Sequence, residues 1–196
     1  MIAVAIELSA FRSKSRFSRP VSTMAFRVDQ SDRPVFTPHQ GEEKVSTHSS
    51  ALNWRRAPHP HDDATYSRNH LVTLSGEQTV QVSASVEFKG DAACADPEQM
   101  LVSAVSSCHM LFFLAIAEHQ GFTVESYKDD ATGYLEKNQA GSVVINRVEL
   151  SPEVRFGGGK VPDAAALGRI HGAAHKNCFI GNSITAEVIV RDRSAL

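Results

Sequence analysis

A long apolar segment with defined ends dominates the fold that this chain can adopt. It begins at Asp96-Pro97, and Gln99 follows three residues after Asp96. An acidic residue ahead of a proline, with Gln three positions later, is typical of a helix N-terminus closed by a capping box. Gly121 supplies the stop at the other end. We therefore predict a helix over residues 97–120 that is apolar on nearly every side and buried at the centre of the fold.

The same segment is interrupted too often for a membrane span. A helix that crosses a bilayer needs roughly 18 or more uninterrupted apolar residues. Three serines and His109 interrupt this segment, and Glu118 closes it. We therefore expect no membrane insertion.

Segments with β-type residues lie on both sides of the predicted helix. The expected strands cover residues 71–74, 79–88, 127–136, 142–154 and 184–190. A second helix fits between the last two, beginning at Asp163 and ending near Asn177. Strands, a long helix, strands, a helix and a strand, in that order, predict an α+β fold with antiparallel sheets around the buried helix.

The first fifty residues differ from the rest in composition. They are rich in Ser, Arg, His and Pro and have few apolar runs, which predicts an extended or disordered extension over residues 1–49. Trp54 indicates that a first strand begins near Ser50. We therefore place one domain at residues 50–196, and a chain that is 42% hydrophobic can bury one core of this size.

The N-terminal sequence carries no convincing targeting signal. Its first eight residues are apolar but include Glu7, and the basic residues follow this stretch where a secretory signal would place them first. The Ser/Arg-rich stretch 9–23 loosely resembles an organelle transit peptide, and an over-extended start with the initiator at Met24 explains it equally well. We expect a cytoplasmic protein.

Charge and cysteine content narrow the function classes. Twenty Lys and Arg against 22 Asp and Glu give a net charge of −2, which leaves no basic excess for a nucleic-acid binder. Three cysteines are too few for a disulfide scaffold. They fit a reducing compartment with at most one functional pair.

The local context of Cys108 leaves its role open. It lies in the middle of the long helix among Ala104, Leu111 and Phe112, and a thiol in such a place is usually an inert packing residue. A cysteine thiol has an ordinary pKa of about 8.5, and roughly 2 kcal/mol of stabilisation is needed to make its thiolate abundant at neutral pH. The helix dipole fades within the first turn. Reactivity would therefore require a nearby cation.

Cys178 follows the apolar stripe of the second helix and is expected to point inward. Two inward thiols, Cys108 and Cys178, are either packing neighbours or a dithiol pair. His171, His175 and Cys178 also have the spacing of a zinc site, but no carboxylate stands at a suitable distance, and we favour a protein without a metal. Cys94 precedes the long helix and has no evident partner.

Two stretches resemble the cysteine motifs of the OsmC/Ohr superfamily, the osmotically induced and organic-hydroperoxide-resistance proteins. They run from Asp96 to Leu111 (DPEQMLVSAVSSCHML) and from Ala173 to Ser183 (AAHKNCFIGNS). The matching features are Pro-Glu ahead of a helix, a cysteine ten residues after that Glu, and a second cysteine at the end of a later helix. The resemblance covers residues 50–196 and is strongest to the less studied OsmC-like branch.

The resemblance implies a thiol peroxidase that works as an intertwined homodimer. Cys108 matches the peroxidatic cysteine, Cys178 the resolving cysteine and Glu98 the acid of the Pro-Glu motif. Arg68 matches, by approximate position, the arginine that such enzymes place beside the reactive thiol. No cofactor is implied, and the reductant would be an external dithiol, which by family analogy is a lipoylated protein.

The expected reaction is the reduction of organic hydroperoxides to alcohols through a sulfenic acid and a Cys108–Cys178 disulfide. The apolar residues Met110, Phe112 and Phe113 favour organic hydroperoxides over hydrogen peroxide. Glu98 and Cys108 stand about 15 Å apart along one helix, so we expect a site near the subunit interface. The alternative is a non-catalytic family member that binds a hydrophobic small molecule in the same cleft.

Overall fold

The computed structural model describes residues 46–194. The transit-like stretch 9–23, Met24 and nearly all of the expected extension lie outside the described residues. The elements, in chain order, are β1 (Ala51–Asn53), β2 (Pro58–His59), β3 (Asp62–Tyr66), β4 (His70–Thr73), the 3-10 turn η2 (Ser75–Glu77), β5 (Thr79–Val82), the 3-10 turn η3 (Val86–Phe88), α1 (Pro97–His119), β6 (Thr123–Asp129), β7 (Thr132–Lys137), β8 (Val143–Leu150), β9 (Pro152–Gly157), α2 (Ala164–Asn177), α3 (Phe179–Asn182) and β10 (Glu187–Val190).

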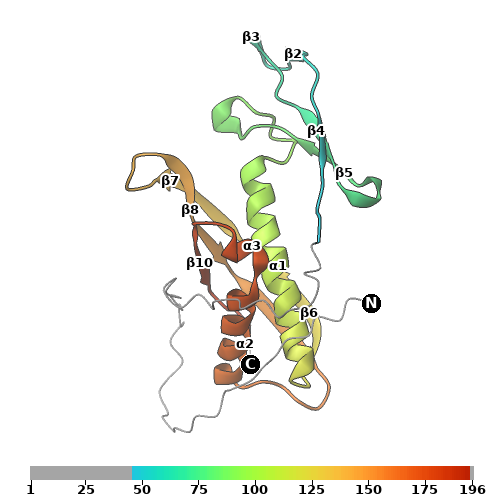
Figure 1. Ribbon diagram of the computed structural model, residues 1–196, viewed down its shortest axis with the longest axis vertical. Coiled ribbons are helices and arrows are strands. Elements are labelled where there is room, and N and C mark those ends of the chain that lie inside the picture. Colours follow the sequence, from blue (N-terminus) through green and yellow to red (C-terminus); the bar gives the residue numbers. More distant parts are fainter. Residues whose placement is uncertain (1–45, 195–196) are drawn as a thin grey trace, which may run out of the picture.

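The chain divides visibly into two parts, which we name the arm (residues 51–95) and the body (residues 97–193). The arm contains the sheet β1-β4-β5 and the hairpin β2-β3. It extends beyond the N-terminal end of α1, whereas α1, α2 and the remaining strands are gathered below it (Figure 1). The first strand begins at Ala51, close to the expected position.

The predicted ends of α1 are confirmed. The Asp96 side chain accepts a hydrogen bond from the backbone N–H of Gln99 at 2.7 Å, and the Asp96 N–H donates to the Gln99 side chain at 3.2 Å, which completes the capping box. Pro97 takes the first helical position, where its missing N–H costs nothing. Gly121 leaves the helix with φ +76°, a conformation that favours glycine.

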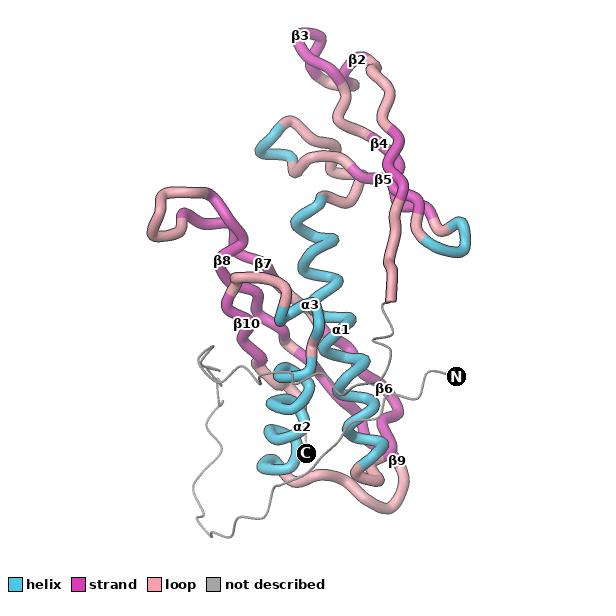
Figure 2. Tube along the Cα trace, viewed as in Figure 1, coloured by secondary structure: helices cyan, strands magenta, loops and turns pink. Residues whose placement is uncertain are grey.

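The body is built on one long bent hairpin (Figure 2). One side of that hairpin is β6 followed by β7, and the other side is β8 followed by β9. β7 pairs with β8 and β6 pairs with β9, and both pairs are antiparallel. Each of the expected strands 127–136 and 142–154 is therefore two strands, β6 and β7 in the first case and β8 and β9 in the second. At the bend the Asp129 carboxylate accepts the Ser151 N–H at 2.6 Å, so a side chain replaces a ladder partner.

β10 joins the other edge of β8 and runs parallel to it. The expected antiparallel arrangement therefore holds for the other strand pairs that are described, and β10 is the exception. The expected strand 79–88 is also shorter than predicted, because β5 ends at Val82 and the chain turns through η3.

The core lies on one face of α1. The C-terminal half of α1 packs with α2, β6 and β9, and the N-terminal half of α1 packs on β8 and β10. The first cluster contains Phe113, Ile116, Ala117, Phe122, Val154, Leu167, Ile170 and Ala174. The second contains Val102, Val105, Val148, Leu150, Ala186, Val188 and Val190. α1 thus positions the residues between these clusters, among them Cys108 and His109.

Within one chain α1 is less buried than its sequence suggests. By length and composition alone it is the one helix of the described residues that is apolar enough to cross a membrane, and 28% of its most apolar window is buried. Leu111 is 60% exposed, and Ser107 and Ala115 are exposed on the same side. A single chain therefore leaves a stripe of α1 uncovered that runs through Ser103, Ser107, Leu111 and Ala115.

Candidate functional site

The structure brings Cys108 and Cys178 together. Cys108 lies in the middle of α1, and Cys178 is both the last cap of α2 and the N-cap of α3. The Cys108 thiol is close enough to Cys178 to raise its pKa, and neither cysteine forms a disulfide. The Cys178 thiol also points at the carbonyl of Val105, one turn before Cys108, at 4.0 Å. Two cysteines that are 70 residues apart in sequence thus form one dithiol.

The two thiols differ in their access to solvent. Cys178 is 1% exposed, whereas Cys108 is half-buried. Burial, and secondarily the neighbouring Cys108 thiol, raise the pKa of Cys178 to about 12, although the Gly181 N–H donates to its sulfur at 3.2 Å. Cys178 is therefore a neutral thiol at physiological pH. A molecule arriving from solvent can reach Cys108 first.

Aromatic side chains form an apolar rim beside this dithiol. Phe112, one turn after Cys108, makes an edge-on contact with Phe179, and their ring centroids are 5.0 Å apart. Phe179 directly follows Cys178 and is 69% exposed. The other two apolar residues expected here lie elsewhere, because Phe113 is fully buried in the core and Met110 lines a groove on another face of α1. The sequence alone does not predict Phe179 at this site, because its closeness to Phe112 depends on how α1 and α3 pack.

Arg68 does not reach Cys108 within one chain. It lies in the arm between β3 and β4, where its guanidinium donates to the carbonyl of Tyr66 at 3.0 Å and stacks 5.0 Å from the centre of the Tyr66 ring. Arg56 lies over the same ring at 5.4 Å. The arm therefore presents two guanidinium groups around one half-exposed tyrosine.

A polar network fixes the loop that carries Arg68. The amide of Asn69 donates to Asp91 at 2.8 Å and accepts from the fully buried hydroxyl of Ser83 at 2.9 Å. Hydrogen bonds from the Ala93 N–H and from Asn69 lower the pKa of Asp91. Because every member of this network is paired, the loop has a defined conformation even though the arm's apolar core is small.

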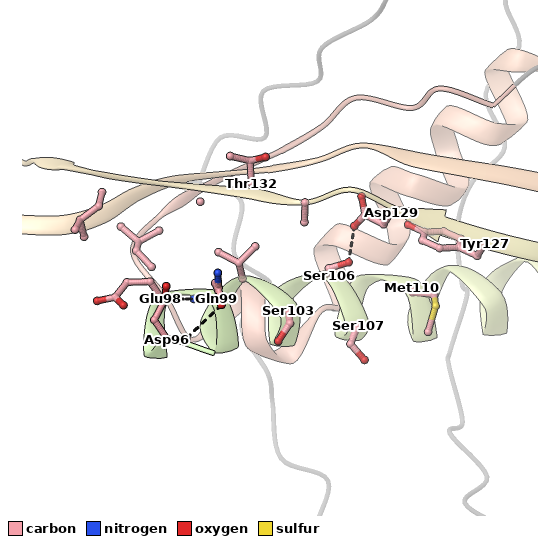
Figure 3. Close-up of a pocket in the computed structure, with 15 residues that line it drawn as sticks. Asp96, Glu98, Gln99, Ser103, Ser106, Ser107, Met110, Tyr127, Asp129 and Thr132 are labelled. Atoms are coloured by element: carbon pink, nitrogen blue, oxygen red, sulfur yellow. Dashed lines mark hydrogen bonds between the residues drawn. The ribbon is translucent and has the colours of Figure 1, made fainter. Parts of the chain in front are cut away.

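Glu98 lies in the first turn of α1 and lines a groove of about 680 Å³ (Figure 3). The groove runs along α1 beneath β6, β7 and β8, with Asp96 and Glu98 at one end and Met110 and Tyr127 at the other. Its α1 residues recur on one face of the helix, and the two thiols are absent from its lining. The structure therefore does not bring Glu98 to Cys108 in one chain.

The histidines next to the dithiol form a buried pair and do not form a metal site. His109 Nε2 and His171 Nδ1 are 3.1 Å apart, and the rings are stacked with centroids 5.4 Å apart. Among residues 46–194 no group of three His, Cys, Asp or Glu side chains could hold a metal ion. The zinc arrangement of His171, His175 and Cys178 is therefore not supported. Cys94 lies apart from this dithiol, in the loop before α1.

Comparisons with known proteins identify the family. The family model described as OsmC-like protein matches residues 89–191. A solved OsmC-like protein of unknown function from Vibrio cholerae is 40% identical, with a TM-score of 0.70, over 77% of this chain and 100% of that one. The chain belongs to the OsmC-like family. The resemblance expected from the two cysteine motifs is thereby confirmed.

More distant members of the OsmC/Ohr superfamily share the fold. An organic hydroperoxide resistance protein OsmC from Legionella pneumophila is 14% identical, with a TM-score of 0.55, over 78% of this chain and 98% of that one. The organic hydroperoxide resistance protein OhrB of Bacillus subtilis is 16% identical, with a TM-score of 0.54, over 76% and 98%. A search of curated protein sequences found no match.

The buried histidine pair of this OsmC-like protein predicts a fold that weakens in mild acid. Burial lowers the pKa of His109 to about 3 and that of His171 to about 4, from 6.5. Below pH 6.5 the two histidines bind protons in the unfolded chain but stay neutral in the folded chain. Their contribution to the free energy of unfolding is therefore complete above pH 6.5 and is lost as the pH falls toward 4. We expect each histidine to remove about 2 kcal/mol of stability between pH 7 and pH 5.

Urea unfolding at the two pH values, at one protein concentration, measures this effect. The double variant His109→Phe/His171→Phe keeps two aromatic rings and removes both titrating groups. Its stability should fall by much less than that of the wild type over the same interval. An equal fall in both proteins would show that other groups control the acid response.

Proposed function

We propose that this OsmC-like protein is a cysteine-based peroxidase that reduces organic, lipid or alkyl, hydroperoxides to alcohols in the response to oxidative stress. The observation that carries the proposal is the dithiol, in which a half-buried Cys108 meets a fully buried Cys178 beside an aromatic rim. A reactive thiol of a peroxidase must be accessible and its resolving partner close by. Both conditions are met by this pair.

In the proposed cycle the Cys108 thiolate attacks the distal oxygen of the hydroperoxide. The O–O bond breaks, Cys108 becomes a sulfenic acid, and the leaving alkoxide takes a proton to give the alcohol. The Cys178 thiol then attacks the Cys108 sulfur, which forms the disulfide and releases water. An external dithiol reduces the disulfide and leaves as its own disulfide, so the two electrons given to the peroxide are returned. We propose a lipoylated protein as that reductant and the cytoplasm as the compartment.

We further propose that a second copy of the chain completes the site. Arg68 would stabilise the thiolate and donate hydrogen bonds to the peroxide, and Glu98 would orient its guanidinium. Neither residue lies beside Cys108 of its own chain. A partner's arm can bring Arg68 there if the two copies exchange arms, which agrees with an arm that projects away from its own body (Figure 1).

The exposed apolar surface supports this homodimer. Seven large apolar side chains of the arm are exposed: Leu52, Trp54, Tyr66, Leu71, Leu74, Val86 and Phe88. Together with the exposed Leu111 of α1 they are apolar groups that a second chain could cover. A bilayer does not suit this surface, because the strands beside α1 have open edges and polar backbone groups that hydrocarbon cannot satisfy. A second protein chain satisfies both the apolar and the polar groups.

The aromatic rim predicts the preference for organic substrates. Replacing Phe179 by Ala removes an exposed apolar surface beside the dithiol, and we expect the KM for cumene hydroperoxide to rise about tenfold, equivalent to about 1.4 kcal/mol of lost contact. The rate with hydrogen peroxide should stay within about twofold, since that substrate has no apolar group to bind. Steady-state peroxide consumption measures both.

A matched control is Val161→Ala, which shortens an exposed apolar side chain ahead of α2. It should leave both substrates unaffected. Equal kcat/KM of the wild type for cumene hydroperoxide and hydrogen peroxide would contradict the substrate preference. Inert thiols together with thermal stabilisation by a hydrophobic ligand would favour a non-catalytic binding protein.

A further inference from the structure

Two buried histidines link the helices that carry the dithiol. His109 directly follows Cys108 on α1, and His171 lies two turns before Cys178 on α2. The rings are nearly parallel, with 8° between their planes, and one hydrogen bond of 3.1 Å joins them. The Phe113 ring also contacts the His171 ring, with centroids 4.5 Å apart and an angle of 36° between the planes. The pair thus forms a side-chain hydrogen bond between α1 and α2, one residue after Cys108 and two turns before Cys178.

Packing between α1 and α2 does not by itself require two buried histidines. The two residues are 1% and 4% exposed, and His109 Nδ1 and His171 Nε2 have no hydrogen-bond partner among the described residues. Two apolar side chains of similar shape would avoid the desolvation of four ring nitrogens. A buried polar pair that costs stability is best attested as a device that fixes the register between helices.

The direction of the hydrogen bond follows from the surroundings. The nearest carboxylate is that of Asp192, 3.9 Å from His171 Nε2. A negative charge there favours a proton on Nε2, so that in the neutral ring Nδ1 is the acceptor. His109 Nε2 is then the donor. The bond therefore needs a specific proton on each ring, and it is directional in a way that apolar contacts between α1 and α2 are not.

We propose that His109 and His171 are positioning residues for the dithiol. Their hydrogen bond fixes how far α1 is shifted along α2, and thereby sets how readily the Cys108 and Cys178 sulfurs bond to each other. A disulfide forms only when the two Cα atoms lie within a narrow range of about 4.4–6.8 Å, so a small slide between the helices is enough to disfavour it. The biological meaning of this role rests on the proposed peroxidase function, but the role itself can be measured without peroxide.

The experiment is a redox titration of the full chain in glutathione buffers. One protein disulfide and two glutathione thiols exchange with one protein dithiol and one glutathione disulfide, and alkylation followed by intact mass gives the ratio. We expect the double variant His109→Leu/His171→Leu, which leaves no unpaired polar group in the core, to disfavour the disulfide about tenfold, or about 30 mV.

Two further variants separate positioning from general stability. His109→Gln places an amide N–H near the position of Nε2 and should restore the equilibrium to within about threefold of the wild type, because its donor can still reach His171 Nδ1. His175→Leu changes a partly buried histidine one turn further along α2 whose ring makes no hydrogen bond in the described residues. It should have no effect on the disulfide.

The outcomes distinguish this inference from the proposed function. A double variant with the wild-type equilibrium, or a His175→Leu variant that shifts as much as the double variant, overturns the positioning role and leaves the peroxidase intact. A histidine-dependent disulfide in a protein whose thiols ignore peroxide overturns the peroxidase and leaves the positioning role intact. A wild type that forms no Cys108–Cys178 disulfide at any glutathione ratio overturns both.

Discussion

Cys108→Ser is expected to lower the rate of cumene hydroperoxide reduction at least a thousandfold. The hydroxyl of serine remains protonated at neutral pH and is a far weaker nucleophile than a thiolate, while its size is close to that of the thiol. The fold should therefore survive, which circular dichroism and thermal unfolding can verify. Peroxide consumption with a dithiol reductant gives the rate.

The other two cysteines provide the controls. Cys178→Ser should still react once with peroxide, because the accessible thiol is unchanged, and should then stop at a sulfenic acid that dimedone traps. Cys94→Ser should behave as the wild type, since Cys94 lies in the loop before α1 and away from the dithiol. If Cys108→Ser kept more than a tenth of the activity, the peroxidatic role would belong to another group.

Arg68→Ala is expected to lower kcat/KM about a hundredfold. Loss of the guanidinium removes roughly 2 kcal/mol of thiolate stabilisation together with hydrogen bonds to the peroxide. Arg68→Lys should recover only part of this loss, because an ammonium group keeps the charge without the planar fork. Arg56→Ala is the matched control, since Arg56 stacks on the same Tyr66 ring and has no part in the proposed reaction.

A mixture of two inactive proteins tests whether Arg68 acts on the partner's dithiol. When Cys108→Ser and Arg68→Ala chains are unfolded together and refolded, about half of the symmetric dimers contain one chain of each kind. Such a dimer pairs an intact Cys108 with the intact Arg68 of the other chain. We expect about a quarter of the wild-type activity to return. No recovery in dimers of verified composition would mean that Arg68 acts within its own chain or not at all.

Much of the body could be predicted from sequence because its signals are local. The ends of α1 follow from Asp96, Gln99 and Gly121, each of which acts on backbone groups within a few residues. The expected strands 127–136 and 142–154 lie in the right places but hide the bend, since the Asp129 to Ser151 hydrogen bond joins residues 22 positions apart. Periodicity carries no information about such contacts.

The candidate site also has some features that local sequence predicts and others that depend on contacts between distant segments. Cys108 and Cys178 were expected to face inward from their helix positions, and the structure places them together. The contacts of His109 with His171 and of Phe112 with Phe179 join different helices, so neither could be derived from spacing along one helix. Glu98 matches a family motif and Arg68 matches by approximate position, and a single chain does not bring either of them to Cys108.

The most direct test of the central claim is the intact mass of the reduced wild type before and after one equivalent of cumene hydroperoxide. We expect the loss of two hydrogen atoms and, after digestion, a single disulfide between the peptides of Cys108 and Cys178. The same bond should be absent from both Cys108→Ser and Cys178→Ser. Survival of all three thiols in a tenfold excess of peroxide would contradict the peroxidase and leave the two cysteines as packing residues.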